Sequence, residues 1–310
     1  MNKVLVTGAN GFVGKHVVAV LQQTSFEVHA VGRSPVDPAV GGTVSRFEGV
    51  KWHRADLFDE SQTEALMERV RPTHLLHLAW EATPGYYWHA PSNYRWVEAS
   101  VRLLRHFHAN GGRRVVAAGT CAEYDWRYGV LFENETPLAH DSTYAVCKNA
   151  FRSLLHRFAA DHDGFSCAWG RLFFLYGPYE HSSRFVPYVI RSLLQNKEAL
   201  CSAGQHLRDY IYVRDAADAL ATLLASEWNG DANIASGETI RMRDMALRIA
   251  YRLGKPELVR FGGSRQEPFP LVQGDISALS ALGWSPRTGL NEGIGRTVAW
   301  WEETMKGGTS

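Results

Sequence analysis

The chain has 310 residues, of which 45% are hydrophobic, so it can bury the core of one large α/β domain with a smaller second lobe. Its 33 lysine and arginine residues nearly balance its 32 acidic residues. A chain without a large positive field is not expected to hold nucleic acid or an acidic membrane. No stretch approaches the roughly 18 consecutive apolar residues of a membrane span, and no signal peptide is evident, so a cytoplasmic location is expected.

The cysteines and histidines do not suggest a metal centre. Four cysteines occur, none of them in a CxxC pair, at Cys121, Cys147, Cys167 and Cys201. This spacing argues against a zinc ribbon or a redox dithiol. His74 and His77 lie three apart on an apolar run that is typical of a strand, where residues at that spacing point to opposite faces. We therefore expect no metal.

Strands and helices alternate through the first half of the chain. Short apolar runs predict strands, and apolar residues at helical spacing predict the helices between them. The expected strands are 3–7, 27–31, 50–54, 73–79, 114–118 and 166–172, and the expected helices are 11–21, 60–70, 93–108 and 143–160. Such alternation implies crossover connections. The expected fold class is α/β, with a Rossmann-like, doubly wound parallel sheet.

Beyond Gly177 the regular alternation of strands and helices is less clear. Helices are expected there at 185–195, 215–226 and 242–253. We expect residues 1–175 to form the dinucleotide-binding domain, with residues 208–230 returning to it. Residues 176–207 and 231–310 are expected to form a smaller, mixed substrate-binding lobe. Because ligands bind outside the carboxyl ends of the strands in open α/β sheets, this lobe should lie there.

A glycine-rich turn follows the first strand and opens the first helix. Gly8 permits the tight turn, Gly11 lets the backbone approach a pyrophosphate, and Gly14 lets the helix pack closely on the sheet. The free N–H groups and positive dipole end of the helix would then face the phosphates. The alternative is an ordinary βα turn. The residues expected to contact the cofactor here are Thr7, Gly8, Asn10, Gly11, Phe12, Val13 and Gly14.

The end of the second strand predicts which dinucleotide is bound. A carboxylate at this place would bind the adenosine ribose and repel a 2′-phosphate. The chain instead has Arg33 and Ser34, which offer a planar cation and a hydroxyl to a phosphate. We therefore expect NADP(H) to be preferred over NAD(H). Arg33 could instead be a solvated residue stacking on adenine, and Asp37 could reach back, so the preference stays open.

Further cofactor contacts are expected after the third and fourth strands of this series. Asp56, followed by Leu57, could accept a hydrogen bond from the adenine amino group, or it could cap the next helix. Leu78, Ala79 and Trp80 end the strand at 73–79, and the Trp80 ring could stack on a nicotinamide or sugar face.

Tyr144 and Lys148 stand four apart at the start of a predicted helix, so they lie on one face, one turn apart. A phenol has a pKa of roughly 10 and is a poor base near neutral pH. A neighbouring ammonium favours the phenolate, so we expect Lys148 to lower the pKa of Tyr144.

The motifs named so far occur in a fixed order together with several others. These others are 77–79, Thr120, 171–178 and 208–215. In this the sequence resembles the extended short-chain dehydrogenase/reductases that act on nucleotide sugars, and the resemblance spans nearly the whole chain. The motifs are specific for the superfamily and much less so for the substrate.

The resemblance implies roles for the matching residues. Thr120 would hydrogen-bond the reacting oxygen, Tyr144 would be the general acid–base, and Lys148 its partner. Arg208 would clamp the diphosphate of a nucleotide sugar. Arg265 matches a position that reaches the nucleotide, although a surface role is an equal alternative.

Further substrate contacts and an oligomeric state are also expected. Glu81, Cys121 and Glu123 are candidates for substrate binding, the two carboxylates through sugar hydroxyls. Family members pair through two long helices, so the resemblance implies a homodimer formed through 93–108 and 143–160.

Departures from the family pattern indicate the reaction. Dehydratases of this family carry Thr-Asp-Glu where this chain has Thr120-Cys121-Ala122, and alanine cannot move a proton. Epimerase/reductases acting at C3 and C5 place their cysteine where this chain has Ala122. The 4-epimerases usually carry an acidic residue after the second strand and tend to have asparagine at the position of Phe174.

The remaining interpretation is an NADPH-dependent ketoreductase, acting at C4 of a 4-keto-6-deoxy nucleotide sugar. The first alternative is a 4-epimerase that retains NAD. The second is a non-catalytic scaffold that binds NADP.

Overall fold

The computed structural model describes residues 2–34, 48–262 and 269–307. Its centre is a seven-stranded sheet in which every pairing is parallel. In spatial order the strands are β12 (Gly230–Ile234), β7 (Ser166–Leu172), β5 (Arg114–Thr120), β4 (His74–His77), β1 (Lys3–Thr7), β2 (Glu27–Gly32) and β3 (Lys51–Arg54). The chain begins in the middle of the sheet and winds outward in both directions, so the expected doubly wound α/β fold is confirmed.

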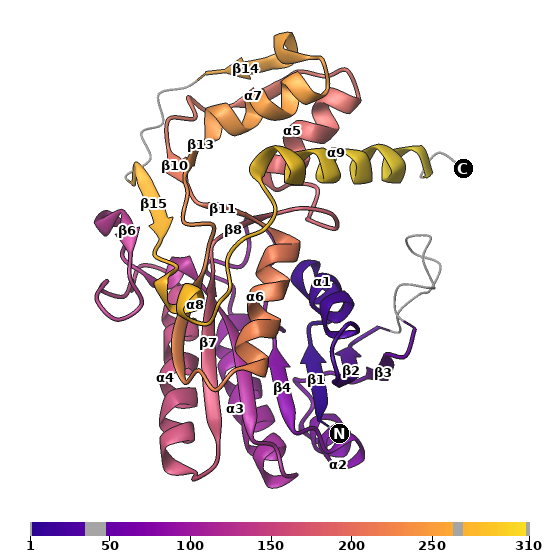
Figure 1. Cartoon of the computed structure of the whole chain (residues 1–310), viewed down its shortest axis with the longest axis vertical. Helices are drawn as coiled ribbons and strands as arrows, with labels where there is room; N and C mark the ends of the chain where they lie inside the picture. Colours follow the sequence, from indigo (N-terminus) through magenta and orange to yellow (C-terminus); the bar gives the residue numbers. More distant parts are fainter. Residues whose placement is uncertain (1, 35–47, 263–268, 308–310) are drawn as a thin grey trace.

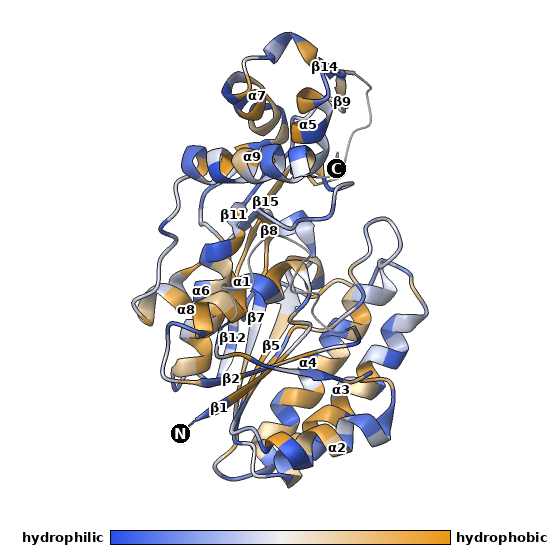
Figure 2. Ribbon diagram, turned by 90° about the vertical axis from the view of Figure 1, so that its right-hand side faces the viewer, coloured by the Kyte–Doolittle hydropathy of each residue, from blue (hydrophilic) through white to orange (hydrophobic). Residues whose placement is uncertain are grey.

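Helices cover both faces of this sheet (Figure 2). One face carries α2 (Glu60–Val70), α3 (Ser92–Ala109) and α4 (Thr143–Asp161), and the other carries α1 (Phe12–Leu21) and α6 (Val213–Ala225). Successive residues of a strand point to opposite faces. Leu5 accordingly packs in the core under α2 and α3, while Val4 and Val6 pack in the core under α1 and α6.

A smaller lobe lies at the carboxyl ends of the strands (Figure 1). Its own apolar core joins α5 (Phe185–Leu194), α7 (Met242–Arg252) and α9 (Leu290–Gly307). Small sheets complete the lobe and connect it to the central sheet. They consist of β13 (Ile240–Arg241), β10 (Leu207–Arg208), β15 (Leu271–Gly274) and β6 (Val130–Leu131), then β11 (Tyr210–Tyr212) with β8 (Phe174–Tyr176), and β14 (Val259–Phe261) with β9 (Ala199–Cys201).

The expected boundary at residue 230 cuts through a strand of the central sheet. β12 pairs with β7 along its whole length, so residues 231–234 do not belong to the lobe to which they were assigned. The short helix α8 (Ser277–Ala281) also packs on the central sheet, where Leu279 is buried with Ile234. The sequence pattern missed both elements because they are short and partly polar.

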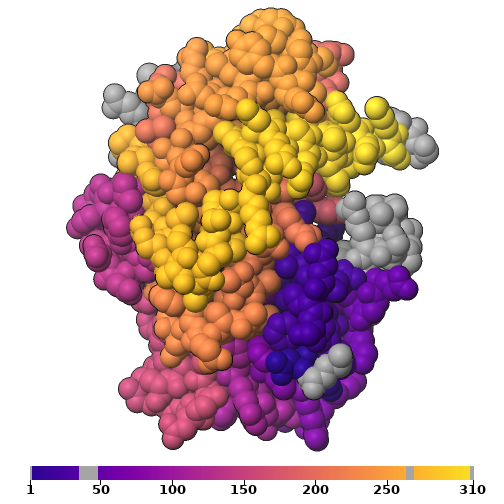
Figure 3. All heavy atoms as spheres, viewed as in Figure 1, coloured from indigo at the N-terminus to yellow at the C-terminus, as the bar shows by residue number. Residues whose placement is uncertain are grey.

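The C-terminal chain returns from the central sheet to the smaller lobe across the face seen in Figure 3. Asp215, in the first turn of α6, fixes this connection. Its carboxylate accepts hydrogen bonds from the backbone N–H groups of Arg287 and Thr288, at 3.2 and 2.8 Å, and from the Thr288 hydroxyl at 3.0 Å. The two lobes are therefore tied together directly before α9 begins.

Within the described ranges, none of the helices has both the length and the apolar character needed to cross a membrane.

Candidate functional site

A cavity of about 820 Å³ lies between the carboxyl ends of the central strands and the smaller lobe. Most of the residues expected at the site line it. They are Gly8, Asn10, Gly11, Phe12, Val13, Gly14, Arg33, Ser34, Asp56, Leu57, Leu78, Ala79, Trp80, Thr120, Cys121, Tyr144 and Arg208. Thr7, Glu81, Glu123 and Lys148 do not line it, and Arg265 lies outside the described residues.

The glycine turn between β1 and α1 has room only for glycine at two positions. Gly8 has φ +68°, and a Cβ added there would lie 2.8 Å from the backbone nitrogen of Ala79. A Cβ on Gly14 would lie 2.1 Å from the carbonyl oxygen of Gly8. Gly11 precedes α1 and caps it with no side chain, so the first N–H groups of the helix face the cavity. The turn therefore fits the pyrophosphate of a dinucleotide.

Thr7 ends β1 directly before the glycine turn and does not line the cavity. Its hydroxyl oxygen accepts hydrogen bonds from the backbone N–H groups of Leu78 and Ala79, at 3.1 and 3.2 Å, and lies 2.8 Å from Nδ1 of His77. His77 is buried, and its Nε2 lies 2.9 Å from the Ser100 hydroxyl. Burial, followed by the charge of Lys148, lowers the pKa of His77 to about 3, so it is neutral. Among the described residues, no cluster of His, Cys, Asp and Glu side chains could hold a metal.

The end of β2 brings Arg33 and Ser34 to the rim of the cavity, and both are exposed. The Asn10 side chain donates a hydrogen bond to the Ser34 carbonyl oxygen at 3.3 Å, which joins this rim to the glycine turn. Gly32 permits the approach, because a Cβ there would lie 2.6 Å from Nδ2 of Asn10. Asp37 lies outside the described residues.

Asp56 lines the cavity next to Leu57 and does not cap the following helix. Its Oδ1 accepts a hydrogen bond from the Phe58 N–H at 3.0 Å. The N-cap of α2 is Asp59, whose carboxylate accepts from the Gln62 N–H at 3.1 Å. The capping alternative considered for Asp56 is therefore wrong.

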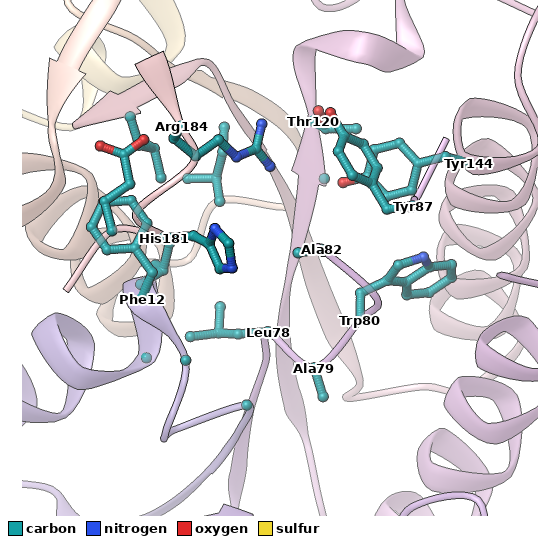
Figure 4. A pocket seen from close by; sticks show the side chains of 18 of the residues that line it. Phe12, Leu78, Ala79, Trp80, Ala82, Tyr87, Thr120, Tyr144, His181 and Arg184 are labelled. Atoms are coloured by element: carbon teal, nitrogen blue, oxygen red, sulfur yellow. The ribbon is translucent and has the colours of Figure 1, made fainter. Parts of the chain in front are cut away.

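Tyr144 stands in the first turn of α4, which begins at the N-cap residue Ser142. Its backbone N–H donates to the Trp88 carbonyl oxygen at 3.0 Å, and its side chain hydrogen-bonds with Thr120 at the end of β5. The Tyr87 ring packs edge-on against the Tyr144 ring, with centroids 4.8 Å apart. Figure 4 shows Thr120, Tyr87 and Tyr144 gathered on one wall of the cavity.

The expectation that Lys148 lowers the pKa of Tyr144 is wrong in this structure. Burial raises the pKa of Tyr144 well above its ordinary value, and Tyr87 and Glu123 add to this effect, while the hydrogen bond with Thr120 opposes it. The Lys148 nitrogen lies 6.0 Å from the centre of the Tyr144 ring. Desolvation disfavours a charged phenolate more than this distant ammonium favours it, so the phenol is neutral.

Lys148 lies one turn further along α4 and is buried behind the cavity wall. Its Nζ donates to the Ala118 carbonyl oxygen at 2.8 Å and lies 4.0 Å from the centre of the Trp80 ring. Burial lowers the pKa of Lys148 to about 7, and the Glu123 carboxylate opposes this shift. The amine is therefore close to its titration midpoint at neutral pH.

The opposite wall of the cavity contains residues that the sequence analysis missed. Glu180, His181 and Arg184 follow β8 and line the cavity, and Figure 4 shows His181 and Arg184 facing the wall with Thr120 and Tyr144. Burial raises the pKa of Glu180 to about 8, and Arg184 opposes this shift. The chain before α5 contains no local pattern that marks these side chains as cavity-facing; only the tertiary fold brings them there.

Arg208, in β10, is buried and lines the cavity. Its guanidinium donates to the carbonyl oxygens of Leu207 and Phe269, at 2.9 and 3.0 Å, and lies 5.8 Å from the Trp126 ring. The next residue, Asp209, accepts hydrogen bonds from the Ser236, Gly237 and Gly274 backbones, at 2.7, 3.1 and 3.2 Å. This buried carboxylate fixes the backbone that carries Arg208.

Of the three other residues expected to bind substrate, Cys121, Glu81 and Glu123, only Cys121 lines the cavity. Cys121 lines the cavity, and burial raises the pKa of its thiol well above the usual range. Glu81 accepts a hydrogen bond from the Thr83 N–H at 3.0 Å and does not line the cavity. Glu123 is fully buried, and protein groups bind both of its carboxylate oxygens. The expectation that Glu123 binds a sugar hydroxyl does not fit this placement, because no oxygen is left to face a substrate.

Comparisons with known proteins cover nearly the whole chain. The model of the NAD dependent epimerase/dehydratase family matches residues 4–235. CDP-abequose synthase of Salmonella typhimurium is 24% identical, over 94% of this chain and 95% of that protein. The dTDP-4-dehydro-6-deoxy-D-allose reductase of a Streptomyces species is 25% identical, over 96% and 95%.

Solved structures include the Thermus thermophilus UDP-glucose 4-epimerase in complex with NAD. It is 28% identical, with a TM-score of 0.83 over 97% of this chain and 99% of that one. The resemblance to the extended short-chain dehydrogenase/reductases is therefore confirmed, together with the expectation of an enzyme.

The burial of Lys148 gives a pH-dependent prediction. We expect its amine to titrate near pH 7 in the cofactor-free protein, because burial destabilises the ammonium. The midpoint can be measured by NMR of protein carrying isotope-labelled lysine, with Lys148→Met to assign the signal. An unfolded lysine keeps a pKa near 10.5, so Lys148 should add stability at high pH that is lost as pH falls towards 7. A midpoint at the ordinary lysine value would contradict the burial described here.

Proposed function

The chain belongs to the NAD dependent epimerase/dehydratase family, and on that premise we propose that it reduces the C4 keto group of a nucleotide-activated deoxysugar with NADPH. The observation that carries the proposal is the neutral, partly buried Tyr144 hydrogen-bonded with Thr120 on the cavity wall. A neutral phenol is the proton donor that reduction of a ketone requires.

The residues that would support other reactions of the family are absent or inactive. Ala122 has no ionisable group and lines the cavity where elimination of water would need an acid or base. The Cys121 thiol has a raised pKa, so little thiolate would be present to remove a proton from carbon. These features support simple carbonyl chemistry, which needs one proton donor and one hydrogen-bond donor.

The reduction can be written from the residues on the wall. The nicotinamide, when bound, supplies the hydride to the carbonyl carbon. Tyr144 gives its hydroxyl proton to the carbonyl oxygen as that oxygen gains charge, and Thr120 stabilises the same oxygen through a hydrogen bond. Lys148 then favours the phenolate that remains on Tyr144, and a proton from solvent restores the phenol. Gly8, Gly11 and Gly14 would hold the dinucleotide by leaving room for its pyrophosphate.

Cations and aromatic rings in the cavity are suited to a nucleotide sugar. Arg208 and Arg184 line the cavity from two different segments of the substrate lobe, and both can bind a diphosphate. Trp88, Trp126 and Phe174 offer rings to the apolar faces of a sugar or base. The names of the Salmonella and Streptomyces relatives, which concern nucleotide-linked deoxysugars, support this substrate class.

A second candidate function is a 4-epimerase that retains NAD. The Thermus thermophilus relative, a UDP-glucose 4-epimerase bound to NAD, favours it. An epimerase oxidises and re-reduces the same carbon, so it keeps its cofactor and needs none from solution. The reductase is preferred here because Arg33 and Ser34 on the cavity rim are suited to the 2′-phosphate of an exchangeable NADPH.

The activity can be tested with C4-deuterated NADPH and 4-keto-6-deoxy sugars linked to different nucleotides. We expect NADPH consumption equal to product formed, and deuterium at C4 of the product.

Tyr144→Phe should lower kcat by about 1,000-fold, because it removes the proton donor. Tyr86→Phe is the matched control, since Tyr86 is 53% exposed and does not line the cavity. Purified protein with a full complement of NAD that does not exchange would favour the epimerase, and an unchanged function in Tyr144→Phe would favour a scaffold.

The NADP preference can be tested at Arg33. Loss of one charge-assisted contact with a phosphate costs about 1.5–3 kcal/mol, so Arg33→Ala should weaken NADPH binding about 10- to 100-fold. NADH binding should change much less, because NADH has no 2′-phosphate. Arg54 is a matched control, since it is an exposed arginine at the end of the neighbouring strand β3 and does not line the cavity. Equal losses for both cofactors in Arg33→Ala would refute the assignment.

We also propose a homodimer formed through α3 and α4. Each helix carries exposed apolar side chains: Tyr94 on α3 is 66% exposed, and Val146 and Leu154 on α4 are 41% and 47% exposed. A buried charge in this interface would be costly, so Leu154→Arg should produce a monomer in light scattering. The matched control is Leu200→Arg in β9, at a residue that is 66% exposed and far from these helices in the sequence. A wild-type protein that is already monomeric would refute the proposal.

A further inference from the structure

The geometry points to Glu123 as a positioning residue that holds Thr120 in place for the reaction, acting from beneath the cavity wall together with Arg171. This inference rests on the proposed function, which gives Thr120 its role. Glu123 is fully buried, does not line the cavity and touches no substrate. Its contacts instead lead from the backbone of Thr120 into the central sheet.

Glu123 binds on two sides at once. Its Oε1 accepts a hydrogen bond from the Thr120 N–H at 2.8 Å. Its Oε2 accepts from Nε1 of Trp169 at 2.8 Å and from Nε of Arg171 at 2.7 Å. Trp169 and Arg171 both belong to β7, so the carboxylate links the end of β5 to the neighbouring strand.

The Thr120 side chain is held by the same short turn. Thr120 caps the 3-10 turn Cys121–Glu123, and its hydroxyl oxygen accepts a hydrogen bond from the Ala122 N–H at 3.2 Å. With the backbone N–H bound to Glu123 and the hydroxyl oxygen bound to Ala122, both ends of the residue are fixed. Because the hydroxyl oxygen accepts this bond, the hydroxyl hydrogen is left to donate, as it must for a developing alkoxide.

Arg171 anchors Glu123 to the rest of the sheet. The guanidinium is fully buried, and it donates to the Tyr124 hydroxyl at 2.8 Å and pairs with Asp231 at 2.9 Å. Tyr124 in turn donates to Oδ1 of Asn233 at 2.8 Å. Asp231 and Asn233 belong to β12, so the network crosses from β5 through β7 to the edge of the central sheet.

The sequence leaves space for this arrangement at Gly119. A Cβ added there would lie 2.1 Å from Nε1 of Trp169 and 2.7 Å from Oε1 of Glu123. Gly119 has no positive φ that would call for glycine on backbone grounds. Its absent side chain therefore allows the indole and the carboxylate to approach the strand that ends in Thr120.

A role in fold stability alone does not account for the buried ion pair of Glu123 and Arg171. Burying two charges costs several kcal/mol per ion, and replacing a buried pair with apolar residues is often neutral or stabilising. Here the charge also acts on the catalytic wall. The negative charge of Glu123 raises the pKa of Lys148 against the stronger opposing effect of burial, and it raises the pKa of Tyr144 in addition to burial.

The first test is Glu123→Gln, which keeps the size of the side chain but has only one acceptor oxygen. That oxygen cannot accept from both Thr120 and the Trp169–Arg171 side. Misplacement of a positioned group costs up to about 100-fold, so we expect kcat to fall about 10- to 100-fold. KM for the keto sugar and Kd for NADPH should change less than about threefold, since no binding group is removed.

The matched control is Arg152→Gln at the outer end of the same network. Arg152 pairs with Asp231 at 2.8 Å and lies on α4, away from Thr120. We expect this variant to lose stability without losing kcat. A Glu123→Gln variant that is less stable but has unchanged kcat, as expected for Arg152→Gln, would overturn the inference.

A second readout does not depend on the reaction. The ionisable groups facing Lys148 are Glu123 of the 3-10 turn, Tyr144 of its own helix and His77 of β4, beside the Trp80 and Trp169 rings. Because Tyr144 and His77 are neutral at pH 7, removal of the Glu123 charge should move the NMR midpoint of the Lys148 amine to lower pH. Arg152→Gln should leave it in place. An unmoved midpoint in Glu123→Gln would contradict the inference.

The two readouts separate this inference from the proposed function. If wild-type protein reduces no keto sugar but Glu123→Gln shifts the Lys148 midpoint, the proposed reaction is wrong and the contact between Glu123 and the catalytic wall stands. If Glu123→Gln does not fold, Arg171→Lys replaces it, because lysine keeps the charge but lacks the planar guanidinium that reaches Glu123 and Tyr124 through separate nitrogens. We expect the same fall in kcat for Arg171→Lys, and unchanged kcat would overturn the inference.

Discussion

The buried amine of Lys148 is the constraint on which the site depends. A charge taken out of water is costly unless it is paired and hydrogen-bonded. Among the described residues, the Lys148 amine donates a hydrogen bond to the Ala118 carbonyl oxygen and lies near the faces of aromatic rings. The pKa is therefore lowered to about 7. This environment forms only when three parts of the fold come together: the helix α4, the end of β5 and the segment after β4 that carries Trp80.

The same burial determines the state of Tyr144. The spacing of Tyr144 and Lys148 on one helix face predicts a phenol made acidic by its neighbour. The structure gives the opposite direction, because desolvation of the hydroxyl outweighs an ammonium that lies 6.0 Å from the ring centre. A neutral phenol is suited to give a proton, and a lysine close to its midpoint is suited to stabilise the phenolate that follows. Both properties are consistent with the proposed reduction.

The sequence predicts those parts of the fold that have local, periodic patterns. The strands Lys3–Thr7 and Ser166–Leu172 and the helix Glu60–Val70 have the predicted bounds, and the glycine turn lies at the expected place on the cavity. The apolar pattern does not predict β12, because Asp231 and Asn233 interrupt it with side chains that bind Arg171 and Tyr124. The sequence pattern also does not predict the helix α9, in which Gly293 lies close to the Tyr176 side chain. The cavity wall from Glu180 to Arg184 and the burial of Glu123 arise only from tertiary contacts.

The most direct test of the account is a crystal structure of the protein with NADP and a nucleotide sugar bound together. We expect the hydroxyls of Tyr144 and Thr120 both to lie within hydrogen-bond distance of the same sugar oxygen. The nicotinamide ring should lie against the carbon that carries this oxygen. The pyrophosphate should lie at the amino end of α1, next to Gly11. A nicotinamide ring bound elsewhere, or a Tyr144 hydroxyl turned away from the sugar, would contradict it.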